Sequence, residues 1–268
     1  MPVRAASMPG MGGVGTTRGR IGVTEQGSGG VPLILLHGVG SDRSVWQPQL
    51  DHFGAARRTL AFDYPGYGDS DLVEDATRED FAAAVLAAMD ALDVQQAHVC
   101  GLSLGGVVAL AMHAAAPHRC ESLILADSFA VHPDGQAIHD RSLAASSELG
   151  MRGLAEARVD ALVGAAASAE VRGEVVETMS RIKPSAYALG VRAVWLADQR
   201  ERAMAVRCPT LILCGSEDRI TPPALSDELK DLIPHAALVE IASAGHLANL
   251  EQPAIFNRVL DGFLGGLE

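Results

Sequence analysis

The chain has 268 residues, of which 48% are hydrophobic and 20% charged, and it carries a formal net charge of −12. These values are normal for a globular protein, and the length suits one large α/β domain with an insertion or two small domains. The acidic balance argues against nucleic-acid binding, because no basic stripe is available to neutralise phosphates.

The N-terminal stretch, residues 1–19, is rich in Gly, Ser and Thr and has no continuous apolar run. We therefore expect a flexible tail rather than a secretory signal. No segment of the sequence contains the ~18 apolar residues that a membrane-spanning helix needs, so we expect no membrane contact and, by default, a cytoplasmic location.

Short, continuously apolar runs recur along the chain and are typical of strands buried on both faces of a parallel sheet. They lie at Val31–Leu36, Arg58–Phe62, Ala97–Cys100, Ser122–Ala126, Thr210–Cys214 and Ala237–Ile241, with a weaker run at Arg20–Glu25. Segments with helical spacing of apolar residues separate them, at Glu79–Asp93, Gly105–Ala116, Pro222–Leu232 and Pro253–Leu264. The alternation predicts an α/β fold with a doubly wound, mostly parallel sheet.

One long stretch interrupts this alternation. Residues 129–204 contain only helix-like pieces, around His139–Leu149, Leu154–Val163, Glu170–Ile182 and Ala186–Leu196. We predict a helical cap over the carboxyl edge of the sheet, inserted into a core formed by residues 20–128 and 205–268.

The strongest local motif is Gly101-Leu102-Ser103-Leu104-Gly105, which matches G-x-S-x-G and follows a predicted strand directly. In a sharp strand-to-helix turn this motif strains the backbone and holds the serine hydroxyl up into a cleft. Gly101 and Gly105 are needed because side chains there would collide with the neighbouring strand and helix. The motif therefore predicts Ser103 as a catalytic nucleophile.

A serine nucleophile needs a histidine base that is oriented by a carboxylate. His246 follows the last predicted strand, in Ala244-Gly245-His246, and is the best placed of the nine histidines. Asp218, in the loop after Thr210–Cys214, is the predicted acid. Asp127 and Glu217 remain alternatives, since each also follows a predicted strand at the same sheet edge.

Backbone donors for a developing oxyanion are expected in two loops. His37-Gly38-Val39-Gly40 directly follows the first strong strand run, and its small residues let N–H groups point into the cleft. We predict that the N–H groups of Val39 and Leu104 form the oxyanion hole, with Gly38 bordering the substrate. The loop Asp63–Ser70 is predicted to shape the floor of the cleft.

With these segments placed, the chain resembles the α/β-hydrolase superfamily from about Arg20 to Leu264. The resemblance rests on HGVG, DYPGYGDS, GLSLGG, GSEDRITPP and AGHLANLEQP, in that order. Within the superfamily the chain is most similar to the 3-oxoadipate enol-lactonase group and related carboxylesterases. This resemblance implies a small-molecule ester or lactone substrate, hydrolysis through an acyl-enzyme, and neither a metal nor an organic cofactor.

The cap is the part that departs most from that group. Enol-lactonases tend to carry an aromatic residue shortly before an arginine at the start of the cap, whereas here Ile138 precedes Arg141. We retain Arg141 as a candidate for binding a substrate carboxylate through its planar guanidinium. Trp46 and Trp195 are candidates for lining the pocket.

Three alternatives to ester or lactone hydrolysis stay open. The same triad could hydrolyse a C–C bond in a ring-cleavage product, or transfer the acyl group to an acceptor other than water. The fold could also serve as a non-catalytic small-molecule receptor, although a receptor need not keep Ser103, Asp218 and His246 together. The sequence does not fix the oligomeric state, and a homodimer is one alternative.

Overall fold

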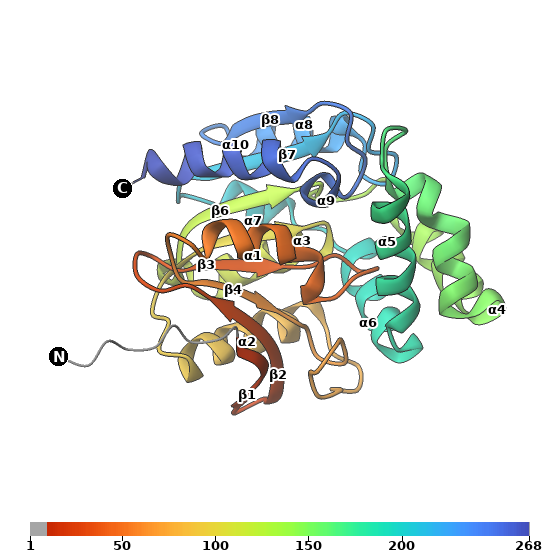
Figure 1. Ribbon diagram of the computed structural model, residues 1–268, viewed down its shortest axis with the longest axis horizontal. Coiled ribbons are helices and arrows are strands. Elements are labelled where there is room, and N and C mark those ends of the chain that lie inside the picture. Colours follow the sequence, from red (N-terminus) through yellow and green to blue (C-terminus); the bar gives the residue numbers. More distant parts are fainter. Residues whose placement is uncertain (1–9, 268) are drawn as a thin grey trace.

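An eight-stranded sheet runs through the centre of the computed structural model, which describes residues 10–267 (Figure 1). The strands lie in the order β1-β2-β4-β3-β5-β6-β7-β8; β1 and β2 run antiparallel to their neighbours, and all other pairs are parallel. The strands are β1 Gly10–Thr16, β2 Gly19–Gln26, β3 Leu33–Leu36, β4 Thr59–Phe62, β5 Ala97–Leu102, β6 Cys120–Ala126, β7 Thr210–Gly215 and β8 Ala237–Ile241. Every predicted apolar run forms a strand, which confirms the predicted fold class.

Both faces of the sheet are buried, as the continuous apolar runs predicted. In β3, Leu33 and Leu35 belong to one apolar cluster, whereas Ile34 and Leu36 belong to the cluster on the other face. Helices supply the other half of each cluster. The helices of the first face are α1 Gln47–Phe53 and α10 Pro253–Gly265, and those of the second face include α2 Arg78–Ala91, α3 Leu104–Ala115 and α8 Pro223–Leu232.

The expectation of a flexible tail over residues 1–19 is wrong for its second half. Residues 10–16 form β1, which pairs with β2 along its whole length, from Gly10 opposite Glu25 to Thr16 opposite Gly19. Strand pairing through backbone groups does not depend on apolar side chains, so a glycine-rich edge strand leaves no hydrophobic signal in the sequence. Residues 1–9 lie outside the described part of the chain.

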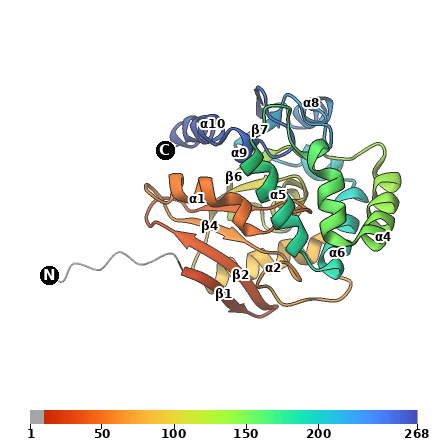
Figure 2. The same ribbon diagram turned by 45° about the vertical axis from the view of Figure 1, so that its right-hand side comes forward.

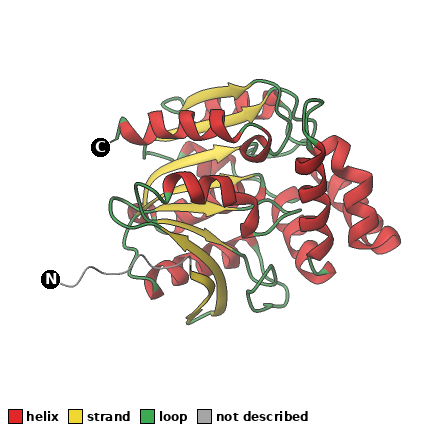
Figure 3. Cartoon of the chain, in the orientation of Figure 1, coloured by secondary structure: helices red, strands yellow, loops and turns green. Residues whose placement is uncertain are grey.

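The insertion between β6 and β7 contains helices as predicted, and three of them form a group at one end of the molecule (Figures 2 and 3). It contains α4 Gly135–Leu162, which is interrupted at Gly150 with φ 66°, α5 Ala169–Arg181 and α6 Pro184–Trp195. A β-bridge between Val131 and Asp198 joins its two ends. α7, Arg200–Met204, contacts α3 and α8 and so packs with the core rather than with the cap.

The remaining helical segments are short: η1 Arg43–Trp46, η2 Pro117–Arg119 and α9 Ala248–Glu251. Cys100, Cys120 and Cys214 are buried free thiols, and burial raises the pKa of the Cys214 thiol to about 12. Across residues 10–267, none of the helices combines the length and apolar character that a membrane crossing requires.

Candidate active site

Ser103 occupies the sharp turn between β5 and α3. Its backbone has φ 55° and ψ −114°, a region that non-glycine residues avoid and that costs about 1–3 kcal/mol. Its N–H donates to the carbonyl of Ala126 at 2.9 Å, and its own carbonyl accepts from Ser128 Oγ at 2.9 Å. The side chain is buried, and Ser103 Oγ has no hydrogen-bond partner among the described residues. The fold thus holds a strained serine with a free hydroxyl.

The two glycines of the motif are required by close packing. A Cβ atom on Gly101 would lie 2.2 Å from the carbonyl carbon of Gly105, and one on Gly105 would lie 2.1 Å from the carbonyl oxygen of Leu36. Both distances are far below any real carbon contact. The steric reason predicted for these glycines is confirmed.

Asp218 and His246 come from loops that follow β7 and β8, and they meet in the fold. Asp218 Oδ2 lies 2.8 Å from His246 Nδ1 and also accepts from Thr221 Oγ1 at 2.6 Å. Burial by itself raises the pKa of Asp218, but the charge of His246 and hydrogen bonds from His246 and Thr221 outweigh it and hold the pKa below its usual range. Asp218 is therefore ionised at neutral pH, and it fixes the ring with Nδ1 toward the carboxylate.

The two alternative acids make other contacts. Asp127 Oδ1 accepts from the Gly215 N–H at 2.7 Å, and Glu217 Oε2 accepts from the Ala165 N–H at 2.8 Å. Burial, together with the nearby charge of Asp218, raises the pKa of Asp127 well above its usual value, the opposite of the shift at Asp218. Asp218 is thus the acid that bonds to the imidazole of His246.

The loop after β3 lies against Ser103. A Cβ atom on Gly38 would be 3.4 Å from Ser103 Cβ and 3.9 Å from Ser103 Oγ. The Gly38 carbonyl contacts His37 Nδ1 at 2.8 Å and accepts from the Ser41 N–H at 3.3 Å. Because a trans peptide points its N–H away from its carbonyl, the Val39 N–H is directed away from these two residues.

Two tyrosines from the Asp63–Ser70 loop brace this segment. Tyr64 donates to the carbonyl of His37 and Tyr67 to the carbonyl of Val39, each at 3.2 Å. Both tyrosines are buried, so these hydroxyls are not free to exchange with water. The loop predicted to form the cleft floor therefore fixes the backbone beside Ser103.

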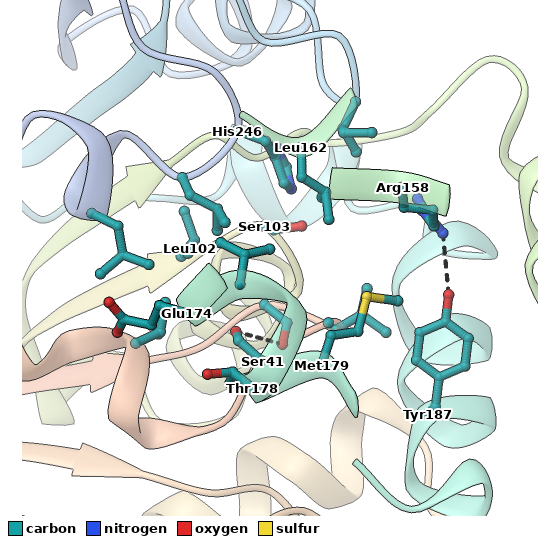
Figure 4. Close-up of a pocket in the computed structure, with 18 of the residues that line it drawn as sticks. Ser41, Leu102, Ser103, Arg158, Leu162, Glu174, Thr178, Met179, Tyr187 and His246 are labelled. Carbon is teal, nitrogen blue, oxygen red and sulfur yellow. Dashed lines mark hydrogen bonds between the residues drawn. The ribbon is translucent and has the colours of Figure 1, made fainter. Parts of the chain in front are cut away.

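Ser103 and His246 line one cavity beneath the cap (Figure 4). In Figure 4 the imidazole of His246 and the hydroxyl of Ser103 face the same space. Val39 and Gly38 line it from the core, and α4, α5 and α6 contribute mainly apolar side chains. These cap residues are Arg158, Leu162, Glu174, Val175, Thr178, Met179, Tyr187 and Trp195.

The substrate-contact predictions have mixed outcomes. Gly38 and Trp195 line the cavity, and Arg141 lines a neighbouring cavity instead. The prediction for Trp46 is wrong, because its side chain is fully buried in the core beside Phe256, with ring centroids 6.1 Å apart. Arg158 was missed: it lies mid-helix in α4, where an arginine in a sequence is normally read as a solvated position.

The cap is joined to both catalytic loops at its α4–α5 connection. The His246 N–H donates to the carbonyl of Leu162 at 2.9 Å. Glu251 accepts from the Gly164 N–H at 2.7 Å through one oxygen and from the Gly245 N–H at 2.9 Å through the other. Together with Glu217 on Ala165, these contacts tie the position of the histidine loop to the position of the cap.

We predict that Glu251→Gln weakens this junction. In this variant the side-chain NH₂ group must face one of the two backbone N–H groups that now donate to the carboxylate. The lost hydrogen bond should lower the free energy of unfolding by about 1–3 kcal/mol. Urea unfolding and kcat measured together test this, with Glu240→Gln at an exposed position of β8 as the control. Unchanged stability in the Glu251 variant would contradict the role of this carboxylate as a tie.

Asp127→Asn is expected to raise stability at neutral and alkaline pH. Because burial raises the pKa of Asp127 in the folded chain, the folded chain holds this proton to a higher pH than the unfolded chain, which releases it at pH ~4; native stability therefore falls as the pH rises from there. Asn keeps an acceptor oxygen for the Gly215 N–H.

The two proteins should therefore have similar stability near pH 4 and diverge toward pH 8, with the Asn variant the more stable. Thermal unfolding across this range checks it, with exposed Asp227→Asn as the control. The opposite result would be a variant that loses stability relative to the parent as the pH rises from 4 to 8. It would show that Asp127 is ionised in the folded chain.

Within residues 10–267, no cluster of three or more His, Cys, Asp or Glu side chains is arranged to hold a metal ion. The site combines a serine in a strained turn, a histidine whose ring is oriented by Asp218, and the Asp218 carboxylate, which also accepts from Thr221.

Comparison with known proteins agrees with this geometry. Residues 33–259 match the family described as "Alpha/beta hydrolase family". The chain belongs to the alpha/beta hydrolase family. This membership confirms the predicted superfamily and the prediction of a hydrolytic enzyme.

Several known proteins are similar to this alpha/beta hydrolase over nearly the whole chain. 3-Oxoadipate enol-lactonase 1 of Acinetobacter baylyi is 28% identical, covering 88% of this chain and 89% of the relative. The malate-bound structure of a thermophilic esterase from Thermogutta terrifontis is 28% identical, with a TM-score of 0.86 and coverage of 95% and 98%. The enol-lactonase from Burkholderia xenovorans is 25% identical, with a TM-score of 0.87 and coverage of 95% and 100%.

Proposed function

We propose that this alpha/beta hydrolase is a serine hydrolase that cleaves a carboxylic ester or lactone through an acyl-enzyme. The observation that carries the proposal is the shared cavity of Ser103 and His246, in which the imidazole is held at Nδ1 by Asp218. Similarity to an enol-lactonase and to an esterase supports the choice of bond.

In the proposed mechanism, Ser103 Oγ attacks the substrate carbonyl while His246 Nε2 removes its proton. Asp218, ionised at neutral pH, stabilises the imidazolium that forms. His246 then donates this proton to the leaving oxygen, which releases an alcohol, or opens the ring of a lactone. Water activated by His246 attacks the acyl-enzyme and frees Ser103.

The oxyanion of the tetrahedral intermediate is assigned to the N–H groups of Val39 and Leu104. Leu104 is the first residue of α3, where unpaired N–H groups and the helix dipole favour negative charge. Val39 lines the cavity, and the hydroxyl of Tyr67 donates to its carbonyl. Donors of this kind contribute roughly 3–4 kcal/mol each to transition-state stabilisation.

A substrate panel tests the proposal against its nearest rival. Purified protein is assayed with 4-nitrophenyl acetate, with simple five- and six-membered lactones, and with a vinylogous diketone from aromatic ring cleavage. We expect turnover of esters or lactones and none of the diketone. Cleavage of the diketone alone would replace this proposal with C–C bond hydrolysis.

A further inference from the structure

A second cavity adjoins the active-site cavity on the side of the cap. It has a volume of about 340 Å³ and shares Arg158, Trp195 and Ile220 with the active-site cavity. Arg141 and Arg219 also line it, and none of its lining residues is acidic. The chain as a whole is acidic, with 33 Asp and Glu against 21 Lys and Arg. A cavity lined by three arginines and no carboxylate therefore has the opposite charge to the rest of the protein.

Other arginines of the cap are neutralised by neighbouring acids. Arg152 on α4 lies 2.7 Å from Glu177, and Arg172 on α5 lies 2.6 Å from Asp160. Arg141, Arg158 and Arg219, by contrast, form no ion pair with a carboxylate in the described part of the chain. Their charges are available to an anion that enters the second cavity.

Arg158 is the best placed of the three, because it is half-buried where the two cavities meet. Its Nη1 donates to Tyr187 Oη at 3.1 Å and to Ser142 Oγ at 3.3 Å, both of which are neutral hydroxyls (Figure 4). These bonds orient the guanidinium through one nitrogen. The edge formed by Nε and Nη2 keeps the geometry that binds a carboxylate through two parallel hydrogen bonds.

The charged residues of the active-site cavity favour one orientation of a negatively charged substrate. Figure 4 shows Glu174 and Arg158 on opposite sides of Ser103. Burial raises the pKa of Glu174, yet its carboxyl still offers no attraction to an anion. A substrate with one negative end is therefore favoured in the orientation that points this end toward Arg158.

From these contacts we infer that the second cavity is a carboxylate subsite. Arg158 binds a carboxylate on the part of the substrate remote from the bond that is cleaved, while Arg141 and Arg219 attract it by charge. The inference rests on the proposed ester or lactone hydrolysis and narrows its substrate class to acidic esters or lactones.

Matched substrates measure this preference. One series contains 4-nitrophenyl monoesters of dicarboxylic acids from glutarate to suberate, each compared with its methyl-capped diester. A second pair places the charge on the leaving group: the acetate of 3-hydroxybenzoate against the acetate of its methyl ester. The quantity of interest is the ratio of kcat/KM for the charged substrate over its neutral partner.

We expect this ratio to exceed 10 in at least one series. In Arg158→Gln the ratio should fall at least 10-fold, because KM for the charged substrate rises. Arg158→Lys keeps the positive charge but loses the planar guanidinium, so it should retain part of the preference for the charged substrate. Arg152→Gln, on the same helix but paired with Glu177, should leave the ratio unchanged. A ratio near 1 in every series, or one that survives Arg158→Gln, would overturn the carboxylate subsite.

Failure of the proposed function would look different. If no ester is hydrolysed, the subsite is measured by binding alone, by calorimetric titration of Ser103→Ala with suberate and with dimethyl suberate. Binding of suberate that Arg158→Gln weakens at least 10-fold would support the subsite on its own. Equal binding of both compounds would overturn it.

Discussion

Ser103→Ala is expected to lower kcat on a 4-nitrophenyl ester by at least ~10³-fold. The substitution removes the attacking oxygen and keeps Cβ, so the strained turn and its hydrogen bonds to Ala126 and Ser128 should remain. The loss should therefore fall on kcat with little change in the unfolding midpoint. Steady-state kinetics and thermal unfolding of the same preparation measure both quantities.

Ser146→Ala is the matched control for this substitution. Ser146 lies on cap helix α4, and its hydroxyl donates to the carbonyl of Leu143 within that helix. Ser146 is half-buried and does not line the active-site cavity, so removing its hydroxyl should leave kcat within about two-fold. Retention of most activity in Ser103→Ala would mean that another group attacks the substrate.

Asp218→Asn is expected to lower kcat by about 10³- to 10⁴-fold while KM changes little. The amide is nearly the same size, but it carries no charge to stabilise the imidazolium. Its NH₂ group can also face His246 Nδ1 and hold the ring in the wrong tautomer. The pH dependence of kcat should be measured over the same range for both proteins.

Asp127→Asn provides the comparison for the acid. Its side chain contacts the Gly215 N–H rather than His246, and burial raises its pKa, so the kcat of the variant should stay within about ten-fold of the parent value. If the Asp127 variant lost more activity than the Asp218 variant, the assignment of the two carboxyls would have to be exchanged.

The core of the fold could be predicted because its strands are buried on both faces. Continuous apolar runs such as Leu33–Leu36 and Thr210–Gly215 leave a clear signal, and the loops that follow them converge at one edge by topology alone. For this reason the sequence could predict Ser103, Asp218 and His246 as a triad; in the structure Asp218 contacts His246, and Ser103 and His246 line one cavity.

What the sequence did not predict depends on contacts between segments far apart. β1 is held by backbone pairing, and Trp46 enters the core because η1 packs toward Phe256. Arg158 follows the break of α4 at Gly150, and it contacts Ser142 before the break and Tyr187 on α6. No periodicity within α4 specifies that arrangement.

The most direct test of the central claim is covalent labelling. The protein is incubated with a fluorophosphonate, and the adduct is located by mass spectrometry of peptides. We predict one adduct, on Ser103, that is absent in Ser103→Ala and forms more slowly in Asp218→Asn. An unlabelled protein, as expected of a receptor on this fold, or an adduct on a different residue would contradict the account.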